Sequence, residues 1–163
     1  MKKTNAMRIL DGLKIPYETK EYADDGEHKL ERGAAEELAA KLGIPPETVY
    51  KTIVMRTESK EIVVFCQSAV HEINLKKART ACGAKDVNPV KPEELLGLTG
   101  YIRGGCSPLG MKRKFRTFID KSILEKEKVY ISAGVRGQQI CLKPEDLIKA
   151  TEAEVTDLIL EEL

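Results

Sequence analysis

The sequence predicts a domain of the α/β or α+β class, with a mixed, mainly antiparallel sheet and helices packed around it. Short β-rich segments alternate with short amphipathic segments along the whole chain, which is typical of this class. Two pairs of neighbouring β-rich segments are joined by turn sequences and predict antiparallel hairpins. No repeat, low-complexity segment or linker interrupts the 163 residues, so residues 1–163 are expected to form one compact domain.

The first half of the chain is expected to contain two helices, a strand and a hairpin. Thr4 is a suitable N-cap, and the apolar residues that follow it recur at helical spacing. Gly43 is a natural C-cap for an alanine-rich helix. In order, the expected elements are a helix over 4–13, a strand over 17–22, a turn at 24–26, a helix over 33–42 and hairpin strands over 49–56 and 61–67.

The second half is expected to place a glycine-rich loop between a basic helix and a second hairpin. Gly83 closes the basic helix, and the hairpin turns at Gly134-Val135-Arg136-Gly137. Residues 155–160 fit the spacing of a strand and of a helix equally well. The expected elements are a helix over 73–82, a strand at Val87, helical turns over 92–96 and 122–124, strands over 117–119, 129–133 and 139–142, and a helix over 143–148.

Composition and charge exclude several classes of protein. The chain is 42% hydrophobic and 33% charged, which suits a domain with a real core. Its net charge of +1 argues against strong non-specific binding of nucleic acid over the whole surface. No apolar run is long enough to span a membrane, and no apolar region follows the basic residues near Met1. We therefore expect a cytoplasmic protein without membrane contact.

The four cysteines, Cys66, Cys82, Cys106 and Cys141, include no C-x-x-C pair. With only two histidines besides, they predict neither a metal site nor a cofactor. Neither histidine, His28 or His71, stands in a recognisable relation to a serine or cysteine, so no catalytic triad is indicated.

The most distinctive stretch is the glycine-rich loop within residues 99–118. Gly104, Gly105 and Gly110 bracket Ser107-Pro108, which predicts a stiff loop with accessible backbone N–H groups. Such a loop can hold an oxyanion or a phosphate. A basic cluster follows, formed by Lys112, Arg113, Lys114 and Arg116. The alternative interpretation is a tight turn with a solvated run of charge.

Cys106 lies within this loop and is the cysteine most worth testing for reactivity. Its neighbours Arg103 and Lys112 could lower the pKa of its thiol. The alternative, which we favour, is a packing role.

Lys51 is the most informative single residue. On a strand it shares one face with Val49, Ile53 and Met55, while Thr52 faces the other way. A lysine among such side chains either reaches past them to solvent or points into a cleft where it has a function. Tyr22, Ser132 and Arg136 could also line a site, although packing and ordinary turn chemistry explain them as well.

Several segments together resemble one known family, the YbaK-like bacterial Cys-tRNA(Pro) deacylases. These proteins are related to the editing insertion domain of bacterial prolyl-tRNA synthetases. The matching segments are Val49-Tyr50-Lys51-Thr52-Ile53-Val54, Asn74-Leu75-Lys76-Lys77-Ala78, Thr99-Gly100-Tyr101, Gly104-Gly105-Cys106-Ser107-Pro108-Leu109-Gly110, Val129-Tyr130-Ile131-Ser132-Ala133-Gly134 and Arg136-Gly137.

The resemblance implies a barrel-like sheet and hydrolysis of the ester between a wrong amino acid and the 3′ end of a tRNA. It implies that Lys51 is the essential lysine and that the Gly104-Gly105 backbone binds the polar groups of the substrate. The remaining residues expected to bind substrate are Tyr22, Thr52, Ser107, Ser132 and Arg136.

The family lacks a protein nucleophile, because the thiol of the substrate's own cysteine attacks its ester carbonyl. Positioning such an internal nucleophile can contribute up to ~7–11 kcal/mol. The implied partners are tRNA and prolyl-tRNA synthetase, with the basic cluster and Lys76, Lys77 and Arg79 facing the acceptor stem. Cys-tRNA(Cys) is a further possible substrate. The alternatives are an Ala-tRNA(Pro) deacylase that uses water, and a non-catalytic module that binds aminoacyl-tRNA or a nucleotide.

Overall fold

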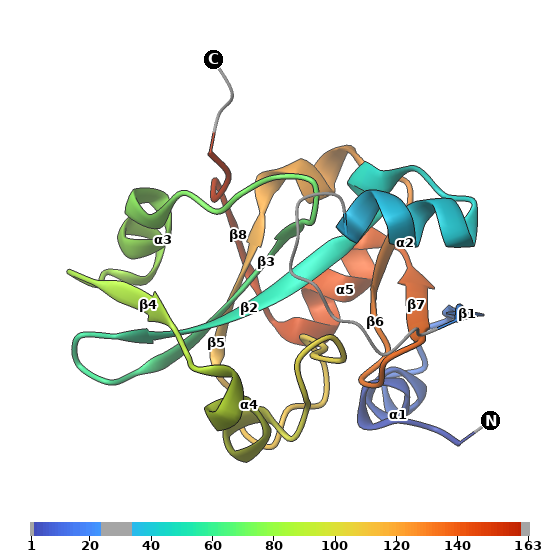
Figure 1. Cartoon of the computed structure of the whole chain (residues 1–163), viewed down its shortest axis with the longest axis horizontal. Helices are drawn as coiled ribbons and strands as arrows, with labels where there is room; N and C mark the ends of the chain where they lie inside the picture. The colour runs from blue at the N-terminus through green and yellow to red at the C-terminus, as the bar shows by residue number, and fades with distance from the viewer. Residues whose placement is uncertain (1, 24–33, 161–163) are drawn as a thin grey trace.

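The computed structural model describes residues 2–23 and 34–160, and within them it contains two β-sheets with helices around them (Figure 1). The turn predicted at 24–26, His28 and the first residue of the helix predicted over 33–42 lie outside the described residues. Among the described residues, no helix is long and apolar enough to cross a membrane.

The smaller sheet is antiparallel and has the strand order β1-β7-β6. Its strands are β1 (Glu18–Glu21), β6 (Val129–Ser132) and β7 (Gln138–Leu142). Strands β6 and β7 form the second hairpin predicted from the sequence. Their register places Gln139 of β7 opposite Ser132 of β6 on one side and opposite Lys20 of β1 on the other.

The larger sheet is mixed and has the strand order β4-β2-β3-β5-β8. The predicted first hairpin forms its antiparallel centre, and the register sets Lys51 opposite Gln67. Strand β5 pairs in parallel with β3, and β8 pairs in parallel with β5, so the start of the ambiguous segment 155–160 is a strand. The strands are β2 (Tyr50–Thr57), β3 (Ile62–Ser68), β4 (Val87–Pro89), β5 (Arg116–Asp120) and β8 (Glu154–Thr156).

The two sheets meet at a single parallel bridge, between Val49 just before β2 and Tyr130 of β6. Beyond this bridge β2 and β6 are not paired, and the sheets are not closed. The expectation of a barrel-like sheet is therefore wrong. Closure would need a continuous ladder between neighbouring strands, whereas one bridge leaves an opening between β2 and β6.

The predicted N-cap at Thr4 is confirmed, because its side chain accepts a 3.2 Å hydrogen bond from Met7 N. Asn74 caps the basic helix in the same way, so that helix begins at Leu75 and not at the predicted Ile73. The helices are α1 (Asn5–Gly12), α2 (Ala34–Leu42), α3 (Leu75–Cys82), α4 (Pro92–Thr99) and α5 (Pro144–Thr151), with 3₁₀ turns η1 (Pro46–Thr48) and η2 (Lys121–Glu125).

The strands separate the core into layers. Tyr50 and Cys66 face the main core, which lies between the two sheets and includes residues of α1 and α5. Residues at the intervening positions of the same strands, such as Met55 of β2 and Phe65 of β3, face the opposite way and pack with α3. Each residue of β2 and β3 can therefore be assigned to one of two faces, and this fixes where Lys51 lies.

Candidate active site

Lys51 and Ser132 lie on opposite sides of the opening between the two sheets. Val49 and Tyr130 form the parallel bridge, and Lys51 and Ser132 stand two residues beyond them on β2 and β6. Because successive side chains alternate in direction, both residues lie on the face turned away from the main core. The structure thus brings together two residues that are 81 positions apart in the sequence.

Two buried glutamines border this pair on the same face. Gln67 is opposite Lys51, and Gln139 is opposite Ser132. Gln67 is 0% exposed and Gln139 is 5% exposed, yet the Oε1 atom of each lacks a hydrogen-bond donor within the described part of the chain. Neither residue was predicted from the sequence. The available signal for Gln67 was a polar residue near the end of an apolar strand, whereas Gln139 follows another glutamine and carries no such signal.

The environment of Lys51 disfavours its charge. The side chain is half-buried, and this burial lowers the pKa of the ammonium below its usual range, while the charge of Glu72 partly offsets the effect. Glu72 lies in the loop after β3, where Gln67 Nε2 donates a 2.8 Å hydrogen bond to the carbonyl of His71. A half-buried lysine with a lowered pKa is a group that can hold or stabilise an anion.

The glycine loop packs against the turn between β6 and β7. The Nε of Arg136 donates a 2.9 Å hydrogen bond to the carbonyl of Arg103. A Cβ added to Gly105 would lie 3.2 Å from backbone atoms of Val135 and Arg136, so the close approach requires glycine there. Gly104 has a φ of +85°. These contacts hold the Gly104-Gly105 backbone beside the strand that carries Ser132.

Tyr22 and Ser132 are tied to the same turn. The backbone N–H of Tyr22 donates a 3.0 Å hydrogen bond to the carbonyl of Gly137. The Oγ of Ser132 accepts a 3.2 Å hydrogen bond from the N–H of Gly134. Tyr22, Ser132, Arg136 and the glycine loop therefore meet at one end of the smaller sheet.

Two of the expected substrate-binding side chains are directed elsewhere. Thr52 lies on the opposite face from Lys51, as the alternation predicted, and its hydroxyl interacts with the thiol of Cys66. Ser107 is 0% exposed, and its Oγ accepts a hydrogen bond from Leu109 N inside the loop. Neither side chain is directed toward Lys51, and Ser107 is buried as a whole residue.

The hypothesis that Arg103 and Lys112 lower the pKa of the Cys106 thiol is wrong. Burial instead raises the pKa of its thiol to about 12, and neither Arg103 nor Lys112 is among the causes of the shift. Arg103 directs its backbone carbonyl to Arg136, and Lys112 packs over Gly100. Cys106 packs against the apolar cluster that includes Val54 and Leu95, which agrees with the alternative packing role.

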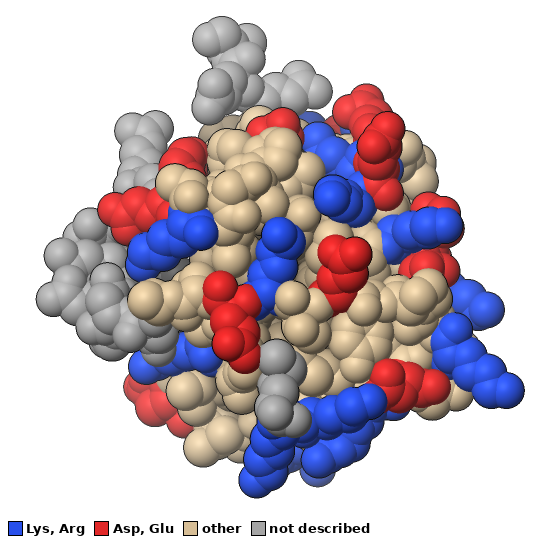
Figure 2. All heavy atoms as spheres, turned by 90° about the vertical axis from the view of Figure 1, so that its right-hand side faces the viewer, with Lys and Arg blue, Asp and Glu red and all other residues tan. Residues whose placement is uncertain are grey.

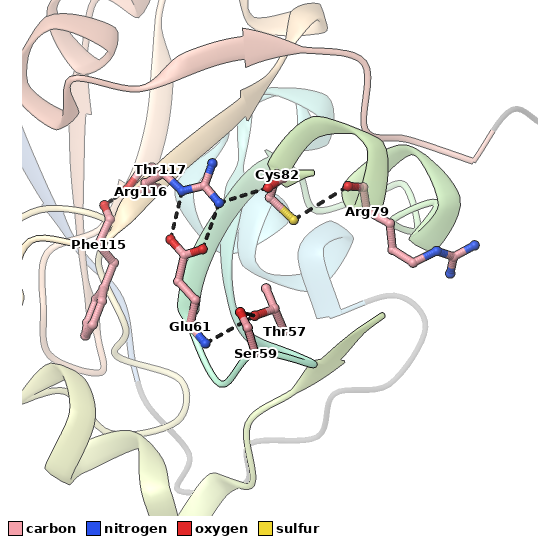
Figure 3. A network of polar contacts seen from close by, with 8 residues as sticks. All are labelled: Thr57, Ser59, Glu61, Arg79, Cys82, Phe115, Arg116 and Thr117. Atoms are coloured by element: carbon pink, nitrogen blue, oxygen red, sulfur yellow. Dashed lines mark hydrogen bonds and ion pairs between the residues drawn. The ribbon is translucent and has the colours of Figure 1, made fainter. Parts of the chain in front are cut away.

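The basic cluster is divided between paired and unpaired residues. Lys114 forms an ion pair with Glu152, and Arg116 donates two 2.8 Å hydrogen bonds to Glu61 and one of 2.9 Å to the carbonyl of Cys82 (Figure 3). Lys112 and Arg113 are exposed and have no carboxylate partner in the described regions. Basic and acidic side chains are interspersed on the face seen in Figure 2, in keeping with the low net charge.

Residues 2–23 and 34–160 contain no group of three or more histidine, cysteine or acidic side chains that could hold a metal ion. The arrangement around Lys51 offers a cation, the exposed backbone of Gly104 and buried amide oxygens, whereas the N–H of Gly105 already donates a 2.9 Å hydrogen bond to the carbonyl of Ile102. Such a site can orient an ester and stabilise negative charge that develops on it.

The comparison with family models defines the class. The model described as the aminoacyl-tRNA editing domain matches residues 31–150, so the chain belongs to this family. Its membership makes the chain an aminoacyl-tRNA deacylase of the YbaK type, as the sequence motifs implied.

Similar curated proteins refine this assignment. The chain is 37% identical to EbsC of Enterococcus faecalis, over 98% of this chain and 95% of EbsC; that protein is named as a candidate Cys-tRNA(Pro)/Cys-tRNA(Cys) deacylase. It is 25% identical to YwhH of Bacillus subtilis over 81% of this chain and 83% of YwhH. It is also 37% identical to the proline–tRNA ligase of Brachyspira hyodysenteriae, over 45% of this chain and 13% of the ligase.

Solved structures share the fold. A crystal structure described as a candidate trans-editing enzyme for prolyl tRNA synthetase superposes with a TM-score of 0.82 and 23% identity, covering 99% of this chain and 100% of the other. The structure of the hypothetical protein APE2540 gives a TM-score of 0.82 at 21% identity, covering 95% of this chain and 99% of the other.

Proposed function

We propose that this protein hydrolyses the ester bond of cysteine mischarged onto tRNA(Pro), and that Cys-tRNA(Cys) is a second substrate. The observation that carries the proposal is the half-buried Lys51 at the opening between the sheets, beside a glycine loop fixed to the turn after Ser132. The near full-length similarity to EbsC supports cysteine as the amino acid.

In the proposed site Lys51 supplies a positive charge, and the glycine loop supplies backbone groups. Lys51 holds the ester or the terminal phosphate and stabilises negative charge that develops on the carbonyl oxygen. The Gly104-Gly105 backbone forms the wall against which the polar groups of the substrate lie. Tyr22, Ser132 and Arg136 complete the pocket, the last mainly by holding the loop in place through Arg103.

The proposed nucleophile is the thiol of the substrate. Its sulfur forms a bond to the carbonyl carbon, the bond from this carbon to the ribose oxygen breaks, and the thiol proton passes to the released ribose oxygen, which becomes a hydroxyl group. Water then opens the thiolactone to give free cysteine. Holding the thiol against its own carbonyl is an intramolecular arrangement, for which up to ~7–11 kcal/mol of rate enhancement is available.

The low net charge has a consequence for tRNA binding. With charges of both signs interspersed, the protein alone should bind tRNA weakly, and we propose that prolyl-tRNA synthetase delivers the mischarged tRNA. The similarity to proline–tRNA ligases is consistent with this shared substrate. In this proposal residues 1–163 act as one editing domain.

The deciding experiment measures deacylation of Cys-tRNA(Pro) and Ala-tRNA(Pro) by the wild-type protein, by Lys51→Ala and by Lys128→Ala. Lys128 is exposed and serves as the matched control. We expect loss of the cysteinyl ester only, abolished by Lys51→Ala and retained by Lys128→Ala. Equal release of alanine would exclude the thiol as nucleophile and indicate activated water. Tight binding without cleavage of either ester, with prolyl-tRNA synthetase present, would indicate a non-catalytic module.

A further inference from the structure

Gln139 is a polar side chain that the fold buries at the candidate site without satisfying it. It lies on β7 between Ser132 of β6 and Lys20 of β1, with 5% of its surface exposed. Its Oε1 is buried and accepts no hydrogen bond within residues 2–23 and 34–160. Lys20, although directly opposite, donates none to it.

Such an arrangement is unfavourable in the free protein. A buried acceptor left without a donor destabilises a fold by about 1–3 kcal/mol, and native structures contain few of them. Leucine or methionine would fill the same position on an apolar strand without this penalty. An unsatisfied amide in this position therefore indicates a donor that arrives with a ligand.

The chemistry of an aminoacyl ester identifies that donor. The site otherwise offers a cationic donor, the half-buried Lys51 ammonium, beside the exposed backbone of Gly104, and an ammonium matches the carbonyl and phosphate oxygens. The α-ammonium of the amino acid is itself a cationic donor and needs an acceptor. A buried carbonyl oxygen beside Ser132 suits it, because hydrogen bonds to charged groups are the stronger ones.

We propose that Gln139 is a specificity-determining residue whose Oε1 accepts a hydrogen bond from the α-ammonium group of the aminoacyl ester. This inference rests on the proposed function and extends it: the enzyme selects esters that carry a free α-amino group. The amide fixes the aminoacyl group at its α-nitrogen, while Lys51 and the glycine loop act on the ester and the nucleotide. No assignment from the sequence motifs included this residue.

Two other glutamines have a buried Oε1 without a donor in the described part of the chain, and both are less suited to this role. The amide of Gln67 already donates from Nε2 to the carbonyl of His71, which fixes the loop that carries Glu72. Gln138 precedes Gln139 on β7 and points to the opposite face, toward the side of Ile140 in the main core. Gln138 is therefore a matched control on the same strand.

The test compares two esters and two variants. The esters are Cys-tRNA(Pro) and 3-mercaptopropionyl-tRNA(Pro), which keeps the thiol and lacks only the α-amino group. The variants are Gln139→Met and Gln138→Met, with Gln139→Leu as a replacement if the first is poorly soluble. Methionine preserves length and removes the acceptor. Thermal unfolding is followed in parallel, and Gln139→Met is expected to leave the protein at least as stable as the wild type.

We expect Gln139→Met to lower kcat/KM for Cys-tRNA(Pro) by about 10- to 150-fold, the range of one hydrogen bond to a charged group. The same variant should cleave the amino-free ester at nearly the wild-type rate, and Gln138→Met should change neither. Equal losses on both esters would show a merely structural role and overturn the inference, as would no loss on either. If the wild type cleaved neither ester, the proposed function itself would fail, and the inference with it.

Discussion

Arg136 and Arg103 join two segments that neither local sequence nor secondary structure connects. The 2.9 Å hydrogen bond from Arg136 Nε to Arg103 O ties the β6–β7 turn to the start of the glycine loop. Gly105 packs against the backbone of the same turn. The loop and the turn therefore form one unit, and the wall proposed to bind the ester depends on both.

Replacing Arg136 by methionine should release the loop from the turn. We expect a loss of about 0.5–1.5 kcal/mol of unfolding free energy for the one hydrogen bond, and a larger proportional loss of deacylase activity because the loop is mispositioned. Urea unfolding and single-turnover deacylation measure the two effects. Arg8→Met is the control, since Arg8 is exposed on α1 and its side chain donates a 2.9 Å hydrogen bond to nearby Asn5, far from the loop and the turn in the sequence. Equal activity of both variants would contradict the positioning role.

The approach of Gly105 to the turn can be tested separately. Gly105→Ala places a Cβ 3.2 Å from the backbone of Val135 and Arg136, which cannot yield as a flexible side chain would. We expect lower stability and lower activity, by about 1–3 kcal/mol for an overpacked site. Gly97→Ala in α4 meets nothing within 4 Å and should stabilise the protein by about 0.4–1 kcal/mol. Similar melting temperatures for the two variants would refute the close packing.

The hairpins and helices could be predicted because each has a local signal. Alternating residues and a turn define β2 and β3, Thr4 marks a helix start and Gly83 marks a helix end. The relation of β2 to β6 could not be predicted this way. It depends on one bridge between Val49 and Tyr130, which is set by the packing of both sheets on a shared core. Because this packing is not encoded locally, the sequence led to the wrong expectation of a barrel-like sheet. For the same reason it gave no indication of Gln139.

Lys51 should decrease stability while it supports function. A lowered pKa means that the protonated side chain is less favourable in the folded than in the unfolded chain. The resulting penalty is present below the folded-state pKa and disappears as the pH rises from there toward the ordinary value of 10.5. Lys51→Met should therefore be inactive. At pH 7 its free energy of unfolding should be higher than that of the wild type by about 0.5–2 kcal/mol, the usual gain when a destabilising group is replaced.

The pH dependence distinguishes this explanation from simple repacking. The difference in melting temperature between Lys51→Met and the wild type should shrink as the pH is raised from 7 to 10. Over the same interval the wild-type deacylation rate should fall as the ammonium is lost, after correction for uncatalysed hydrolysis. A constant difference in melting temperature would show that the charge of Lys51 is not responsible.

Arg113 and Arg116 lie three residues apart and should behave differently toward tRNA. Arg116 is engaged by Glu61 and Cys82 (Figure 3), so Arg116→Ala should mainly reduce stability, by up to about 1 kcal/mol. Arg113 is exposed and unpaired in the described regions, and Arg113→Ala should lower the slope of log K against log salt by about 0.7–0.9 for tRNA(Pro). An unchanged slope would remove Arg113 from the tRNA interface.

The thiols of Cys66 and Cys106 should be unreactive in the folded protein. Burial raises the pKa of each to about 12, so the thiolate is scarce at pH 8, and the thiolate is the form that attacks alkylating reagents. We expect iodoacetamide at pH 8 to modify both residues far more slowly in the native protein than in urea, as read by peptide mass spectrometry. Cys106→Ser should retain deacylase activity, because the thiol that reacts belongs to the substrate. Rapid native labelling of Cys106, together with inactivation, would instead make it a protein nucleophile and overturn the substrate-thiol mechanism.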